Sequence, residues 1–149
     1  MKTSRLPARL KPLYALAKKA RKNSHSPYSG CKVGAAILLT NGKVFSGCNV
    51  ENSSYGATVC AERGAIQTAV AAEGKIKIAQ IVVVTDSSPP WLPCALCRQV
   101  ISEFAAKSPG GDIPVHCTNL EGDAISTTFL ALYPGLFSPE ELRAGQSRA

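Results

Sequence analysis

The chain contains 149 residues, of which 45% are hydrophobic and 18% are charged. This length is that of one domain, and this composition excludes an intrinsically disordered or a collagen-like protein. No apolar run approaches the roughly 20 residues that a membrane-spanning helix needs.

The positive charge is concentrated near the N-terminus. Residues 1–50 contain ten of the 17 Lys and Arg residues and no Asp or Glu. In this segment Leu6, Leu10, Leu13 and Ala17 recur at helical spacing, which predicts an amphipathic first helix with a solvated basic face. A transit peptide and a nucleic-acid-binding segment are the alternatives. Because the N-terminus has no apolar signal core, we expect a cytoplasmic protein.

A hairpin and then alternating helices and strands follow this helix. Residues 33–39 form an apolar strand, and Asn41-Gly42 is a strong signal for a turn into a second strand over 43–50. The remaining predicted elements are, in chain order, a helix over 60–73, a strand over 78–85, a helix over 93–106, strands over 113–118 and 124–129, and a short helix over 130–133. We expect one α/β domain over 1–149, with helices covering a mixed sheet and frayed ends at 1–5 and 145–149.

Two cysteine motifs open two of the predicted helices. Cys94 and Cys97 are three residues apart, so their sulfurs lie on one helix face and can bind one metal ion. Cys60, at the start of the other helix, can supply a third thiolate if the two helix ends lie side by side. Three protein ligands leave one position for water, which is the pattern of a catalytic rather than a structural zinc site.

The neighbours of Cys60 suit such a site. Three thiolates give the zinc site a net negative charge, and Arg63, one turn after Cys60, can withdraw part of it by hydrogen bonding to sulfur. Glu62 is expected to point away from the sulfurs, as a proton carrier beside the bound water rather than a ligand. Gln99 is a candidate for orienting Glu62 or the groups around the metal.

Structural zinc binding and a redox-active cysteine pair are the alternatives for a C-x-x-C motif. A structural site needs a fourth ligand at similar spacing, and neither His25 nor His116 forms a paired motif. A redox pair leaves the Cys60-Ala61-Glu62 segment unexplained. The combination of two helix-start motifs therefore favours catalytic zinc.

Taken together, the motifs resemble the cytidine deaminases, in particular their short, homotetrameric form. The segments that carry the resemblance are 27–29, 33–36, 47–52, 60–63, 93–99 and 132–137. The first helix matches as well, which argues against the transit peptide. The resemblance implies a three-layer α/β/α sandwich around a mixed sheet of about five strands.

The resemblance also implies functional roles for residues outside the cysteine motifs. Asn49 and Glu51 correspond to the pair that binds ribose hydroxyls, and the backbone of Ala61 to a group that reads the pyrimidine edge. Phe137 corresponds to an aromatic residue that reaches the site of a neighbouring subunit, so a homotetramer with shared sites is implied. For these residues a purely structural role is the alternative.

The implied reaction is the hydrolytic deamination of cytidine or deoxycytidine in pyrimidine salvage. One Zn²⁺ per subunit activates a water molecule for attack on C4 of cytosine, and no organic cofactor is needed. Glu62 carries a proton to N3 and helps to protonate the leaving ammonia. A small-molecule nucleoside is thus the expected partner, with no membrane and no nucleic acid.

Three positions depart from the family pattern. Cys31 stands where an aromatic residue usually lines the substrate pocket; we expect a buried apolar thiol there and count Cys31 among the candidate substrate-binding residues. Ala95 replaces a glycine. Trp91 lies in an unusually apolar loop before the second cysteine motif, as a candidate pocket-rim residue or as plain packing.

These departures put the preferred substrate in doubt, and the basic charge of residues 1–50 leaves a further function open. A deaminase of a larger aminopyrimidine nucleoside, similar to the blasticidin-S deaminases, is one alternative. A basic RNA-binding or RNA-editing protein is another, although aromatic residues make up only 6% of the chain, and they do not alternate with basic ones. The last is a zinc-stabilised scaffold without activity.

Overall fold

The computed structural model describes residues 3–105 and 112–135. It contains six strands, four α-helices and two short 3₁₀ helices within these ranges. The strands are β1 (Ser4–Arg5), β2 (Gly34–Leu39), β3 (Val44–Cys48), β4 (Ile78–Val84), β5 (Pro114–Thr118) and β6 (Asp123–Thr128). The helices are η1 (Ala8–Leu10), α1 (Lys11–Arg21), η2 (Tyr55–Ala57), α2 (Ala61–Glu73), α3 (Ala95–Phe104) and α4 (Phe129–Leu132).

The strands form one mixed sheet in the order β1-β6-β5-β4-β2-β3. β4 and β5 run parallel, and the other neighbouring pairs are antiparallel. β4 has the β-branched, continuously apolar sequence expected of a strand that is covered on both faces. Its Val82 and Val84 pack with α1, whereas Ile81 and Val83 face the opposite layer.

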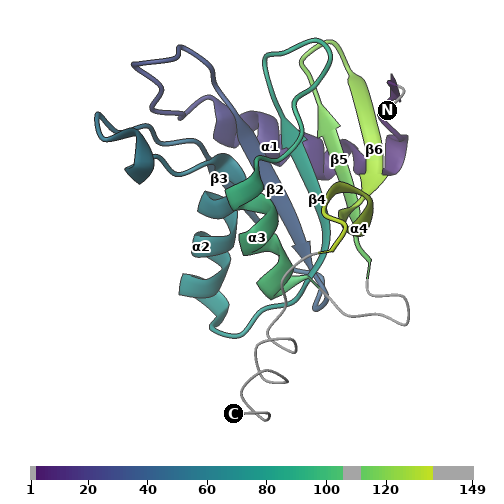
Figure 1. Ribbon diagram of the computed structural model, residues 1–149. Helices are drawn as coiled ribbons and strands as arrows, with labels where there is room; N and C mark the ends of the chain where they lie inside the picture. Colours follow the sequence, from purple (N-terminus) through teal and green to yellow (C-terminus); the bar gives the residue numbers. More distant parts are fainter. Residues whose placement is uncertain (1–2, 106–111, 136–149) are drawn as a thin grey trace.

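Helices cover both faces of the sheet. α1 lies on one face, where its Leu13 and Ala17 are buried against Ala36 and the β4 valines. α2 and α3 lie side by side on the other face over the larger hydrophobic core (Figure 1). The predicted amphipathic first helix and the three-layer α/β/α sandwich are confirmed.

The structure differs from the prediction at the ends of several elements. The sheet has six strands rather than about five, because Ser4 and Arg5 pair with Ala124 and Asp123 of β6. These two residues are therefore not frayed as predicted. Residues 1–2 and 145–149, which were also predicted to fray, lie outside the described residues. The helix predicted over 93–106 begins only at Ala95.

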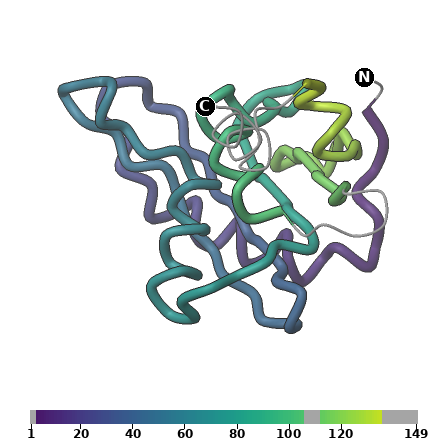
Figure 2. Tube along the Cα trace, turned by 60° about the horizontal axis from the view of Figure 1, so that its bottom comes forward, coloured from purple at the N-terminus to yellow at the C-terminus, as the bar shows by residue number. Residues whose placement is uncertain are grey.

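Two loops extend together from one end of the sheet. The loop before β2 and the segment between β3 and α2 lie side by side in both views of the chain (Figures 1 and 2). Below them β3 passes against the start of α2, where Gly47 lies so close to the helix backbone that a Cβ atom there would be 2.8 Å from the carbonyl oxygen of Ala61. This close approach packs the first turn of α2 directly against β3.

Candidate functional site

The two cysteine motifs meet at the N-terminal ends of α2 and α3. Cys60 and Cys94 are the N-cap residues of these helices, and both have extended backbone conformations. Cys97 lies in the first turn of α3 and is buried, whereas Cys94 is exposed and Cys60 is half-buried. The three sulfurs lie within 4.8 Å of one another. The helix ends thus stand side by side, as the metal-site hypothesis required.

The sulfur positions fit a zinc ion. Zn–S bonds of about 2.3 Å in a tetrahedral arrangement place two sulfurs about 3.8 Å apart. The Cys60 and Cys94 sulfurs are 3.8 Å apart. Among the described residues, no fourth Cys, His or carboxylate joins this group. Both of these cysteines also line a pocket, so a metal ion held by the three sulfurs would lie beside a cavity.

Arg63 lies beside the first of these sulfurs. Its Nη2 donates a hydrogen bond of 2.7 Å to the carbonyl oxygen of Thr58 and lies 3.8 Å from the Cys60 sulfur. Hydrogen bonding from the Cys97 thiol, with a further contribution from Arg63, lowers the pKa of Cys60 to about 5. The same contact with Cys60, together with burial, raises the pKa of Cys97. Of the two sulfurs Cys60 and Cys97, Cys60 is therefore the one that ionises more readily, to the thiolate form that binds zinc.

Glu62 is a buried carboxyl group in the same pocket, with 4% of its surface exposed. Burial disfavours its ionised form and raises its pKa to about 7. Hydrogen bonding from the Cys97 thiol opposes part of this rise in the pKa. A carboxyl group with a pKa near 7 can both accept and return a proton at neutral pH.

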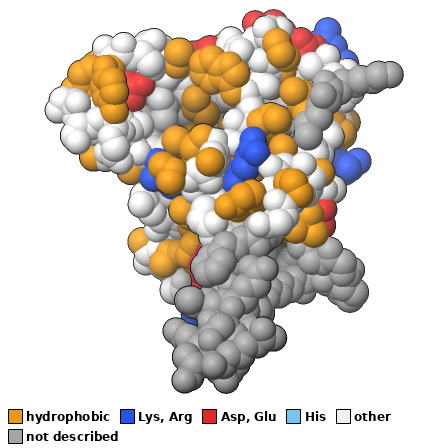
Figure 3. All heavy atoms as spheres, viewed as in Figure 1, with side chains coloured by type: hydrophobic (Ala, Val, Ile, Leu, Met, Phe, Trp, Pro, Cys, Tyr) orange, Lys and Arg blue, Asp and Glu red, His pale blue; other side chains and the backbone are white. Residues whose placement is uncertain are grey.

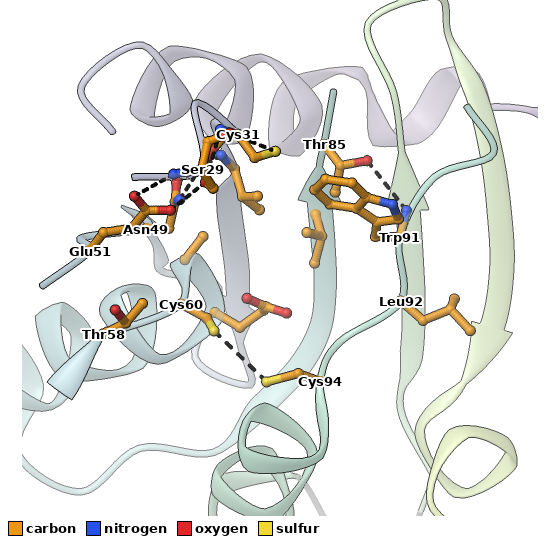
Figure 4. A pocket seen from close by; sticks show the side chains of 14 residues that line it. Ser29, Cys31, Asn49, Glu51, Thr58, Cys60, Thr85, Trp91, Leu92 and Cys94 are labelled. Carbon is orange, nitrogen blue, oxygen red and sulfur yellow. Dashed lines mark hydrogen bonds between the residues drawn. The ribbon is translucent and has the colours of Figure 1, made fainter. Parts of the chain in front are cut away.

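The pocket that unites these groups has a volume of about 350 Å³. Figure 4 shows its walls: Ser29 and Cys31 come from the loop before β2, Asn49 and Glu51 from the segment after β3, and Trp91 and Leu92 from the loop before α3. Among the described residues, no Lys or Arg lines this pocket. A small, uncharged molecule fits this lining better than a polyanion does.

Asn49 and Glu51 line the pocket and are tied to its rim. The Asn49 side chain accepts hydrogen bonds from Ser24 Oγ (2.5 Å) and the Val33 backbone N–H (2.8 Å), and donates one to the Cys31 carbonyl oxygen (2.9 Å). Glu51 accepts hydrogen bonds from the hydroxyl and backbone N–H groups of Ser29 and from the backbone N–H of Tyr28. Both side chains are thus held in fixed positions facing one cavity.

Comparisons with known proteins agree with this geometry. Residues 8–109 match the family model described as the cytidine and deoxycytidylate deaminase zinc-binding region. The chain belongs to this deaminase family. It is 47% identical over 130 residues to a cytidine deaminase of Sporosarcina psychrophila, a match that covers 87% of this chain and 92% of the relative. The crystal structure of cytidine deaminase from Burkholderia pseudomallei superposes with a TM-score of 0.78 at 41% identity, covering 89% of this chain and 100% of that one.

Family membership also indicates that this deaminase binds zinc. The matched family region is zinc-binding, and the three sulfurs form a metal site of the right size. One zinc ion per subunit is therefore its cofactor. The described part of the deaminase contains no helix that is long and apolar enough to cross a membrane.

The basic residues at the end of the first helix lie away from this site. Lys18, Lys19 and Arg21 belong to the last turn of α1, which covers the face of the sheet opposite α2 and α3. On the face that carries α2 and α3, Lys and Arg are scattered among hydrophobic and polar side chains (Figure 3). The basic N-terminal segment is thus an element of the fold rather than a wall of the pocket.

The remaining predicted site residues have mixed outcomes. Cys31 is half-buried on the pocket wall, with its sulfur 3.6 Å from the Ser29 carbonyl oxygen, so the expectation of a buried apolar thiol was wrong. Ala61 lines the pocket. Gln99 accepts a hydrogen bond of 2.8 Å from the Tyr133 hydroxyl and contacts Ser102; its role toward Glu62 remains a prediction. Phe137 lies outside the described residues.

Sequence reasoning did not find Arg98, which supports the second cysteine motif. Its Nε donates a hydrogen bond of 2.7 Å to the carbonyl oxygen of Pro93, the residue before Cys94. Its Nη1 donates another of 2.7 Å to the carbonyl oxygen of Leu132 in α4. The guanidinium therefore joins the loop that carries Cys94 to the C-terminal end of the described chain. A positive residue next to Cys97 was the available signal, but it does not reveal which carbonyl groups are bound.

Replacing Arg98 with methionine is expected to lower the free energy of unfolding by roughly 2 kcal/mol, because two partly buried carbonyl groups lose a charged donor. Zinc should also leave the variant faster when a chelator is added, since the Cys94 loop loses its anchor. Thermal unfolding and the rate of zinc release check this. Replacing the exposed Lys75 with methionine is the control for lost positive charge. Release rates equal to those of the unmodified protein would contradict the anchoring role.

Proposed function

We propose that this protein is a zinc-dependent cytidine deaminase, which hydrolyses cytidine or 2′-deoxycytidine to the corresponding uridine and ammonia. The observation that carries the proposal is the placement of Glu62, a buried carboxyl group, in one pocket with sulfurs spaced for zinc. Relatives in the family named cytidine deaminase support the substrate class.

Each wall of the pocket has its own part in this reaction. When bound through Cys60, Cys94 and Cys97, zinc supplies Lewis-acid chemistry that makes water nucleophilic near neutral pH. Glu62 holds the proton taken from that water, passes it to N3 of the base and returns a proton to the leaving amino group. Burial keeps the pKa of Glu62 near 7, so both transfers occur without a strongly unfavourable charge state.

The opposite wall of the pocket orients the substrate. We propose that Asn49 and Glu51 bind the ribose hydroxyl groups, because both line the pocket and are already held by their neighbours. Such preorganised groups bind a ligand without a further loss of side-chain entropy. We also propose that the backbone of Ala61, which lines the pocket at the start of α2, binds the edge of the pyrimidine. Arg63, beside the Cys60 sulfur, reduces the negative charge of the thiolates.

The family resemblance also supports a homotetramer in which Phe137 reaches the site of a neighbouring subunit, and a cytoplasmic role in pyrimidine salvage.

A second candidate substrate is a larger aminopyrimidine nucleoside. The small Cys31 side chain on the pocket wall favours it, because the thiol leaves space there. Asn49 and Glu51 favour an unmodified ribonucleoside or deoxyribonucleoside.

The proposal is tested by following the ultraviolet absorbance of cytidine and deoxycytidine after adding zinc-loaded protein. We expect conversion to uridine or deoxyuridine, with one ammonia released per nucleoside. Chelated protein is the control and should be inactive, with activity restored by zinc. A folded, zinc-loaded protein that leaves both nucleosides unchanged but deaminates a larger aminopyrimidine nucleoside would favour the second candidate.

A further inference from the structure

One large aromatic side chain of the pocket has no part in the reaction described so far. Trp91 is 44% exposed and lines the cavity. Among the described residues that form the lining, it is the one aromatic side chain. The other apolar lining groups near it, Val83 and Leu92, are aliphatic.

The backbone of Trp91 is held in place although its ring is exposed. Its N–H donates a hydrogen bond of 3.4 Å to the hydroxyl of Thr85, which is itself 1% exposed at the end of β4. The next residue, Leu92, packs against the main core. The backbone at Trp91 is therefore held in place. Figure 4 shows the side chain beside Thr85, on the side of the pocket away from Glu51.

The wall formed by the loop before β2 is very different in character. There the pocket is lined by Ser29 and Cys31, both with small side chains. An indole leaves much of its apolar surface exposed to water in this position, which is unfavourable unless a ligand covers it. A planar pyrimidine offers a π-face to an aromatic ring, whereas ribose does not.

We propose that Trp91 binds the face of the pyrimidine base and thereby determines substrate affinity. This inference rests on the proposed function, because it takes an aminopyrimidine nucleoside as the ligand. The contact is with the base ring rather than with the atoms that react. It is made equally in the ground state and in the transition state, so it contributes to KM and leaves kcat nearly unchanged.

The kinetic test compares two substitutions of Trp91. Trp91→Leu removes the π-face and is expected to raise KM for cytidine roughly 10-fold, with kcat within about 2-fold. Trp91→Phe retains an aromatic ring and should keep KM within about 3-fold. Because Trp91 is exposed and outside the core, both variants should fold, which circular dichroism checks. An unchanged KM in Trp91→Leu, with normal turnover by the unmodified protein, overturns this inference and leaves the proposed function intact.

A second readout does not need turnover. Trp91 is the single tryptophan of the chain, so its emission reports on this pocket alone. In zinc-loaded Glu62→Gln protein, excited where cytosine does not absorb, cytidine should change the emission in a saturable way and free ribose should not. Equal responses to both ligands, or no response to either, overturn the base contact. A saturable response to cytidine from a protein whose unmodified form deaminates neither nucleoside would uphold the contact and overturn the proposed function.

Discussion

Replacing Glu62 with glutamine is expected to lower kcat for cytidine by about 10²- to 10⁴-fold, because the amide cannot accept and return a proton. Zinc content should not change, since Glu62 is not among the three grouped metal-binding side chains. The free energy of unfolding should not fall, because burial disfavours the charge that glutamine lacks. Steady-state kinetics, metal analysis and thermal unfolding on one preparation measure all three.

Glu51→Gln is the matched control for this substitution. Glu51 is the second carboxylate of the pocket, held by Ser29 on the ribose side that we propose. Its loss should raise KM on the order of 10-fold with a much smaller change in kcat, because a charged hydrogen-bond acceptor is lost. If Glu62→Gln changed KM and Glu51→Gln changed kcat, the two proposed roles would be reversed.

Replacing Gly47 with alanine is expected to destabilise the protein by about 3 kcal/mol, at the upper end of the usual cost of overpacking. The added Cβ would lie 2.6 Å from the carbonyl carbon of Gly64 and 2.8 Å from the carbonyl oxygen of Ala61. These are backbone atoms of α2, so relief requires the helix to move away from β3. Because the N-terminus of α2 carries Cys60 and Glu62, zinc affinity and kcat should fall together. Thermal unfolding at saturating zinc, chelator competition and steady-state kinetics measure the three effects.

Gly56→Ala provides the control for adding a methyl group. Gly56 lies in η2 on the loop beside the pocket, and no atom lies within 4 Å of the position that its Cβ would take. We expect unfolding temperature, zinc affinity and kcat to stay close to those of the unmodified protein. A Gly47→Ala variant as stable as Gly56→Ala would show that β3 and α2 are not packed as closely as described.

The core of the site could be predicted because its residues are local in sequence. Cys60 and Glu62 stand two residues apart, and Cys94 and Cys97 stand one turn apart, so each pair has its geometry set by one helix start. A single long-range assumption, that the two helix ends meet, completed the metal site. The strongly apolar β4 made this assumption reasonable, since a strand buried on both faces needs a helix layer above it.

The walls of the pocket could not be predicted in the same way. The exposure of Cys31 depends on the loop before β2. The position of this loop is set by hydrogen bonds from its own Ser29 to Glu51, which belongs to another segment. The hydrogen bond from Arg98 to Leu132 connects residues 34 positions apart, which no local pattern reveals. β1 has two residues, too few to show any period of hydrophobicity.

The unequal burial of the three cysteines has a consequence for their access to solvent. Cys94 is exposed, Cys60 is half-buried and Cys97 is buried, so Cys94 is the most accessible of the three. Cys94 is also the first of the three sulfurs that a soluble oxidant reaches, and a zinc-bound thiolate is protected from oxidation compared with a free one. Zinc bound at this site therefore also protects its most exposed ligand, and removing the metal makes Cys94 the ligand that oxidants reach most easily.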